Sequence, residues 1–197
     1  MKLKRILSLA LSGVLAVSMM TGCFGGGGKS DAINRSSTVA SALNGAVSSV
    51  SFKTNDSKLN KAVSTITDSL TQAQAKVNGP VEDNSNIQAT ARQVTGYEDM
   101  NVNVKWNTQE QTGSKTFVRI FVFDATNSNY DSPEEITKAV SDKFTETMKL
   151  ETATGNDSVT NEYKGYVCAY ETEVGTEEEP ASAWVIGVAL TQTVKAK

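Results

Sequence analysis

The sequence predicts an α+β fold with a mainly antiparallel sheet of four to five strands, one helix on one sheet face and an N-terminal helical pair on the other. Three observations predict this class. Between residues 36 and 77, apolar side chains recur every three or four positions, which is the period of a helix. Residues 116–123 and 183–193 are apolar on both faces of a strand, so both sheet faces need a cover. A strong helix start at Ser132 lies between these two strands.

The chain begins with the features of a secretory signal. Met1–Arg5 is a short basic head, and residues 6–20 form an apolar run of about 15 residues, which is shorter than the roughly 20 needed to span a bilayer. Small residues, Thr21 and Gly22, follow this run and precede Cys23. A basic head, a short apolar region and small residues are typical of a signal that is removed after export.

The segment Met20-Thr21-Gly22-Cys23 resembles the lipobox of bacterial lipoproteins, with Met20 where that motif usually has Leu, Val or Ile. The resemblance covers residues 1–23. It implies that residues 1–22 are the signal peptide and that Cys23 becomes the N-terminus, carrying a diacylglyceryl group and acyl chains such as palmitate. By the same resemblance the protein is extracytoplasmic and anchored to the cell membrane by lipid. In a cell with two membranes the outer membrane is expected, because Phe24 differs from the aspartate that marks inner-membrane retention.

Length and charge limit the organisation of the remaining chain. We expect a lipidated cysteine and Gly-rich tether over 23–35, the helical pair over 36–79, and the α+β sheet domain over 80–197. Loss of the three basic residues in the signal takes the formal charge from −3 to −6. An acidic chain gains nothing from counterion release on nucleic acid, so we expect no nucleic-acid partner.

The helical pair is predicted by two apolar stripes. The stripes consist of Val39, Leu43, Ala46 and Val50, and of Leu59, Val63, Ile66, Leu70, Ala73 and Val77. Residues 54–57 offer N-cap side chains between them, and Asn78-Gly79-Pro80 ends the second helix. Such stripes either pack on their own domain or mediate oligomerisation, so the oligomeric state stays open.

The sheet is predicted from segments in which apolar and polar residues alternate and from segments that are apolar on both faces. Residues 101–106 alternate, with Val102, Val104 and Trp106 on one face, and another strand is possible over residues 87–94. A hairpin over 107–114 leads to the central strand 116–123. After the loop that follows, Ser132-Pro133-Glu134-Glu135 begins a helix with a capping box. That helix carries Ile136, Val140, Phe144 and Met148 on one stripe, and strands over 159–172 and 183–193 complete the sheet.

The residue types exclude several kinds of catalysis. The chain has no histidine, which removes the Ser-His-Asp triad, the Cys-His pair and histidine-ligated zinc, and it has no G-x-S-x-G motif. A carboxylate-based hydrolase using Asp124 with Asp131 or Glu135 remains as an alternative. The same three carboxylates are the calcium candidate, because Asp124 and Glu135 have the spacing of the first and last ligands of an EF-hand loop. A strand-to-helix loop that ends in a capping box explains the same residues without a metal or other cofactor.

Three further groups of residues have both a structural and a functional interpretation. Cys168 lies in a predicted strand and is expected to be a small buried hydrophobe. The acidic residues near the last hairpin either protect a solvated tip or bind a basic partner; they are Glu171, Glu173, Glu177, Glu178 and Glu179. The aromatic residues either fill the core or line a sugar- or peptide-binding face; they are Tyr163, Tyr166, Tyr170, Trp106 and Trp184.

These observations favour a lipid-anchored extracytoplasmic binding or accessory module of the bacterial cell surface that is not an enzyme. Its ligand would be an unknown protein or small molecule. The alternative is a structural or assembly lipoprotein that binds a protein partner through the helices of residues 36–79.

Overall fold

The computed structural model describes residues 32–76, 85–100, 112–142, 157–175, 178 and 180–197. Its helices are α2 (Ser36–Ala46), α3 (Ser57–Ser69), α4 (Gln72–Ala75), α5 (Ser85–Thr95) and α6 (Pro133–Asp142). Its strands are β1 (Ile33–Asn34), β2 (Ser51–Lys53), β3 (Glu98–Asp99), β4 (Gly113–Asp124), β5 (Val159–Gly175) and β6 (Pro180–Ala196).

The described strands form one six-stranded sheet. Its order is β1-β5-β6-β4-β3, and β2 also pairs with β5. The long strands β4, β6 and β5 are antiparallel neighbours, whereas β2 and β3 run parallel to β5 and β4. The mainly antiparallel sheet is thus confirmed, and the expected number of four to five strands is too low. The sequence does not predict the short strands β1, β2 and β3, because they are too short to show an alternating pattern.

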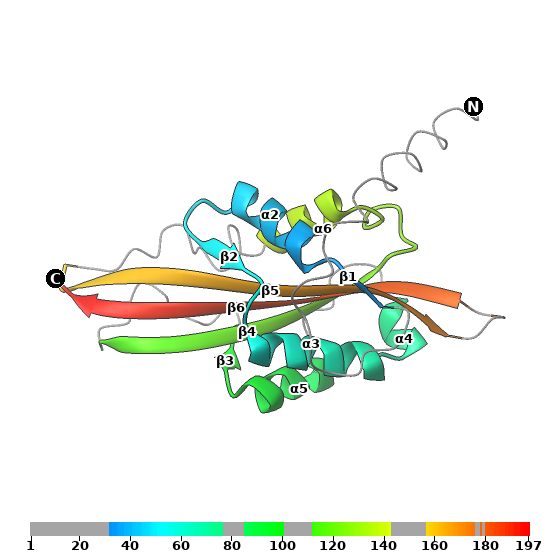
Figure 1. Ribbon diagram of the computed structural model, residues 1–197, viewed down its shortest axis with the longest axis horizontal. Helices are drawn as coiled ribbons and strands as arrows, with labels where there is room; N and C mark the ends of the chain where they lie inside the picture. The colour runs from blue at the N-terminus through cyan, green and yellow to red at the C-terminus, as the bar shows by residue number, and fades with distance from the viewer. Residues whose placement is uncertain (1–31, 77–84, 101–111, 143–156, 176–177, 179) are drawn as a thin grey trace.

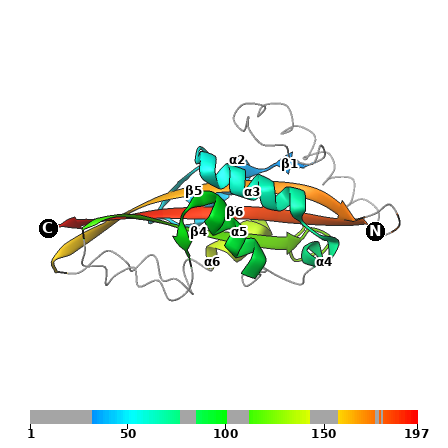
Figure 2. The ribbon, with the colours of Figure 1, turned by 90° about the horizontal axis from the view of Figure 1, so that it is seen from below.

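Helices cover both faces of the sheet, as its two-faced apolar strands require (Figure 1). On the first face, α2 and α6 pack on β4, β5 and β6 through residues such as Leu43, Ile136, Phe121 and Trp184. On the second face, α3 and α5 lie side by side (Figure 2) and cover residues such as Ile120 and Val185. The middle of β6 is therefore buried between two helical layers.

The N-terminal helical pair is divided between these two faces, which corrects the expectation that it covers one face. After α2, β2 joins the edge of β5 and places Phe52 in the core of the first face. The chain then crosses the sheet edge, and α3 packs on the second face through Leu59 and Val63. The two apolar stripes have the same spacing, so their periodicity carries no information about which sheet face each one meets.

Residues 85–95 form helix α5, and the interpretation of residues 87–94 as a possible strand is wrong. The buried residues of α5 are Ile87, Gln88, Ala91 and Thr95, whose spacing is helical. The predicted strand 101–106 and residues 107–111 of the predicted hairpin lie outside the described residues. The predicted strands at 116–123, 159–172 and 183–193 are confirmed as the inner parts of β4, β5 and β6.

Side-chain amides and a hydroxyl complete the hydrogen bonding at the strand edges. Gln88 of α5 donates to the carbonyl of Ile120 at 2.7 Å and accepts from its amide at 3.0 Å. Asn44 of α2 makes the same pair of bonds to Phe52 in β2. The Ser36 hydroxyl accepts from the amide of Ala169 in β5 at 3.0 Å. An edge strand whose backbone is satisfied in this way is a poor template for pairing with another chain.

Helix α6 begins at the predicted cap residue Ser132, but the Glu135 carboxylate pairs with the hydroxyl of Ser132 and not with its amide, as a capping box requires. The amide of Glu135 donates to the Ser132 hydroxyl at 3.4 Å, and this hydroxyl donates to the Glu135 carboxylate at 3.1 Å. The stripe residues Ile136 and Val140 are fully buried, while Phe144 and Met148 lie outside the described residues.

Replacing Ser132 by alanine is expected to lower the free energy of unfolding by about 1 kcal/mol, because the cap of α6 is lost. Chemical denaturation of the variant measures this change. Ser128→Ala, at an exposed position of the same loop, is the matched control and should change the stability by less than about 0.5 kcal/mol. Equal losses in both variants would contradict a specific role of the cap.

Candidate functional site

The loop before α6 uses its carboxylates locally. Asp124 accepts hydrogen bonds from the amide of Thr126 at 2.9 Å and from its hydroxyl at 2.6 Å. The Glu135 carboxylate accepts from the hydroxyl of the cap residue Ser132 at 3.1 Å. Among the described residues, no three Cys, Asp or Glu side chains are placed to hold a metal ion. The calcium candidate formed by Asp124, Asp131 and Glu135 is therefore not assembled, and the loop has the geometry of a strand-to-helix connection.

The aromatic residues do not share one binding face. Trp184 is a core residue of the first face, and Tyr163 packs against the same core. Burial raises the pKa of Tyr163 to about 12. Tyr166 and Tyr170 pack against the core of the second face, while Trp106 lies outside the described residues. Side chains alternate along a strand, so Tyr163 must point away from the face that holds Tyr166 and Tyr170.

The structure shows where Cys168 and three of the acidic residues near the last hairpin lie. Cys168 is fully buried in the core of the second face, as predicted. Glu171 forms an ion pair with Arg35 at 2.8 Å, which holds the chain next to β1 against β5. Glu173 and Glu178 are exposed, and Glu177 and Glu179 lie outside the described residues.

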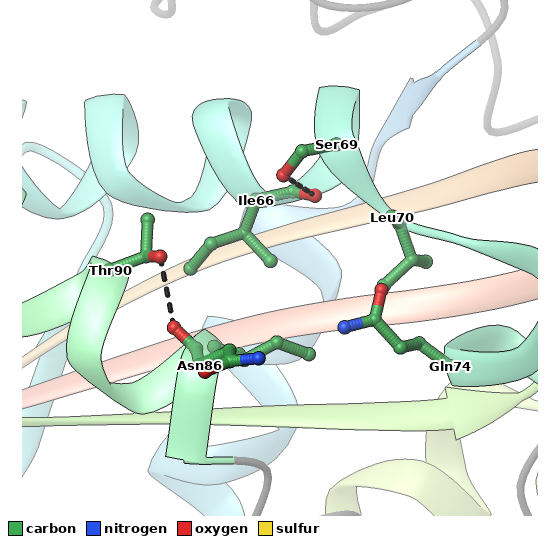
Figure 3. Close-up of a pocket in the computed structure, with 7 residues that line it drawn as sticks. Ile66, Ser69, Leu70, Gln74, Asn86 and Thr90 are labelled. Atoms are coloured by element: carbon green, nitrogen blue, oxygen red, sulfur yellow. Dashed lines mark hydrogen bonds between the residues drawn. The ribbon is translucent and has the colours of Figure 1, made fainter.

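A shallow cavity lies between α3, α4 and α5 (Figure 3), and its volume is about 80 Å³. Its lining consists of Ile66, Ser69, Leu70, Gln74, Asn86, Ile87 and Thr90. Pockets for small organic ligands usually measure about 300–1,000 Å³. This cavity has room for a few water molecules only, so it gives no support to a small-molecule pocket.

Among the described residues, no helix covers one end of the second sheet face (Figure 2). Rows of side chains on this face continue past the row formed by Val118, Ala189 and Tyr166. We name the uncovered rows the polar ledge: Thr116, Thr191 and Lys164, then Ser114, Thr193 and Glu162, then Lys195 and Thr160. All of these side chains are polar, and each is exposed or partly exposed.

Hydrogen bonds and an ion pair order the polar ledge. The hydroxyls of Ser114 and Thr193 lie 2.9 Å apart, as do those of Thr116 and Thr191. Lys195 pairs with Glu162 on the neighbouring strand. Cross-strand pairs of this kind stabilise a sheet and hold its side chains in fixed directions. The ledge is therefore an ordered polar surface on a rigid sheet.

The inner margin of the ledge is a corner between the sheet and the start of α3. Tyr97 donates from its hydroxyl to Asp56 at 2.7 Å, and Asp56 also caps α3 by accepting from the Leu59 amide at 2.9 Å. The ammonium of Lys58 lies 5.4 Å from the centre of the Tyr97 ring. Tyr166 stands beside Lys53 of β2 in the last covered row.

Burial is the largest cause that raises the pKa of Tyr97, followed by its hydrogen bond to Asp56 and the charge of that carboxylate. The phenol therefore stays protonated at physiological pH and acts as a donor. Sequence reasoning missed this corner, because Tyr97 and Asp56 are 41 positions apart and belong to no local motif.

Comparison with known proteins adds no relationship: no family model matches the chain, and no match is found among curated proteins or solved structures. In the part of the chain that the structure describes, no helix is both long and apolar enough to cross a membrane. The N-terminal motif and the surface of the domain are therefore the features that bear on function.

Proposed function

We propose that this protein is a lipid-anchored, extracytoplasmic binding module of the bacterial cell surface, attached through Cys23 and using the polar ledge as its binding surface. The observation that carries the proposal is the Met20-Thr21-Gly22-Cys23 motif directly after a short apolar run with a basic head. The glycine-rich segment behind Cys23 suits a tether between lipid and domain.

The position of β1 shows where the tether joins the domain. Ile33 follows Cys23 by ten residues, so it lies within about 35 Å of the lipidated residue. It pairs with Glu171, whose neighbour in β6 is Trp184. The ledge residue Thr193 lies nine positions further along β6, at about 3.4 Å for each residue, or roughly 30 Å away. The tether thus joins the domain at β1, roughly 30 Å along the sheet from the ledge.

The alternative of an assembly lipoprotein that binds a partner through residues 36–79 has less support. Val39 and Leu43 of α2, and Leu59 and Val63 of α3, are fully buried against the sheet. Their apolar stripes are used inside the domain. A carboxylate-based hydrolase has less support as well, because Asp124 and Glu135 are engaged in local turns.

Replacing Cys23 by serine is expected to abolish labelling of the protein with radioactive palmitate and to move it from the membrane fraction to the soluble extracytoplasmic fraction. The physical reason is that serine has no thiol to accept the diacylglyceryl group. Labelling and fractionation of the producing cells measure both effects. Cys168→Ala is the matched control, since it removes the other cysteine of the chain and should leave labelling intact. Unchanged labelling of Cys23→Ser would refute the lipid anchor.

A further inference from the structure

Unpaired lysines surround the inner corner of the polar ledge. Lys53, Lys58, Lys61 and Lys164 are exposed, and in the part of the chain that the structure describes none of them forms an ion pair. The chain without its signal has a formal charge of −6, so a group of unpaired cations contrasts with the rest of the molecule.

The lysines come together from three elements. Lys53 is the last residue of β2 and lies beside Tyr166, one row inside Lys164 on β5. Phe52 points into the core of the first face, so its neighbour Lys53 points to the face of the ledge. Lys58 stands at the start of α3 above the Tyr97 ring, and Lys61 follows one turn later on α3. Lys53, Lys58 and Lys164 therefore lie at the boundary between helix and ledge, and Lys61 lies one turn of α3 further from it.

The side chains of the ledge differ from those of a typical protein–protein interface. Protein interfaces have a core of aromatic and aliphatic side chains, whereas the ledge presents hydroxyls and charged groups only. Hydroxyl groups both donate and accept hydrogen bonds, which suits a ligand that carries many hydroxyls. Along β6, Lys195 lies four residues beyond Thr191, the partner of Thr116. The ledge is therefore about 14 Å long, because two strand residues advance about 6.8 Å. This is a shallow, extended surface that fits a chain-like ligand better than a compact one.

We propose that the polar ledge binds an anionic polysaccharide, with its sugar hydroxyls on the Ser and Thr rows and its carboxylate or phosphate groups on Lys53, Lys58, Lys61 and Lys164. The inference rests on the proposed extracytoplasmic location, where such polymers occur. Exposed ammonium groups attract anions through water, so each site binds weakly and added salt weakens it further. Repetition along the polymer and among anchored copies of the protein increases the total affinity.

The test uses the lipidated protein in neutral detergent and calorimetric titration at low salt with four polymers. They are polygalacturonate, which carries carboxylates, dextran phosphate, which carries phosphates, neutral dextran, and polyglutamate as an acidic peptide. We expect binding to one or both of the first two, no binding to dextran, and at least tenfold weaker binding at 0.5 M salt. The better ligand of the first two identifies the anionic group.

The variant Lys58→Gln/Lys164→Gln removes two cations of the corner and is expected to weaken this binding at least tenfold. The control Lys76→Gln/Lys138→Gln has the same net charge as the test variant. Lys76 follows α4 and Lys138 lies on α6, and both are exposed and away from the ledge. The control should bind like the unmodified protein. Equal thermal unfolding midpoints verify that neither variant is misfolded.

Three results would overturn the inference. They are no binding to either anionic polysaccharide, an equal loss in both lysine variants, and binding to polyglutamate as tight as to the polysaccharides. The last result would indicate an acidic protein as the partner. Palmitate labelling of Cys23 is measured separately, so an intact anchor without polymer binding removes the ligand inference alone. A missing anchor removes the proposed location.

Discussion

Gly187→Val is expected to unfold the domain, and Gly187→Ala to lower its free energy of unfolding by about 2–3 kcal/mol. Gly187 lies in the middle of β6, between Ile120 of β4 and Cys168 of β5. A Cβ atom added there would lie 2.3 Å from a methyl carbon of Val63 and 3.0 Å from one of Leu59. Real Cβ atoms do not approach other atoms to 2.3 Å, so the side chain of Val63 or the helix α3 that carries it would have to shift. Since native domains are stable by only about 5–15 kcal/mol, the larger valine should exceed the tolerance of this core.

Thermal and denaturant unfolding of the Gly187 variants measure the effect. The double variant Gly187→Ala/Val63→Ala should be less destabilised than the sum of its single changes, because the smaller side chain on α3 makes room for the new Cβ. Gly45→Ala on α2 is the control, since nothing lies within 4 Å of a Cβ at that position. In a helix that change should stabilise by about 0.5–1 kcal/mol. A Gly187→Ala variant as stable as the unmodified protein would show that α3 does not pack on β6 in this way.

Gln88→Leu is expected to lower the free energy of unfolding by about 2–4 kcal/mol. The Gln88 side chain is buried and forms two hydrogen bonds to the backbone of Ile120, at 2.7 and 3.0 Å. Leucine has a similar size and would leave the amide and the carbonyl of Ile120 without these partners at a buried position. An unsatisfied buried polar group costs about 1–3 kcal/mol, and this change creates two of them.

Denaturant unfolding again measures the loss, and the slower hydrogen exchange expected at the Ile120 amide of the unmodified protein gives a local readout. Gln93→Leu is the matched control, because Gln93 is on the same helix and is exposed. Its effect should stay within about 0.5 kcal/mol. If the Gln88→Leu and Gln93→Leu variants were equally stable, the hydrogen bonds between Gln88 and Ile120 would make no measurable contribution to the free energy of unfolding.

The candidate surface could be predicted from the sequence only in part. Alternation in β5 and β6 identifies Thr191, Thr193 and Lys164 as residues on strands, and their polarity indicates exposure. Their alignment with Thr116 and Ser114 of β4 depends on strand register. The corner needs Asp56 and Lys58 from the start of α3 together with Tyr97, which is 41 positions from Asp56. No periodicity of one segment reports such distant contacts.

By itself the sequence determined the features that follow from short-range order. Two-faced apolar strands, the cap at Ser132 and the first parts of the two helical stripes depend on neighbours within a few positions, and the structure contains them. The second predicted helix is shorter than expected, because α3 ends at Ser69 and Leu70 is extended. The tertiary structure alone decided that Phe52 joins the first core, so that α2 and α3 lie on opposite faces, and that residues 85–95 form a helix. The physical reason is that a periodic pattern specifies which side of an element is buried, whereas its partner is chosen by strand register and by the fit of side chains from distant parts of the chain.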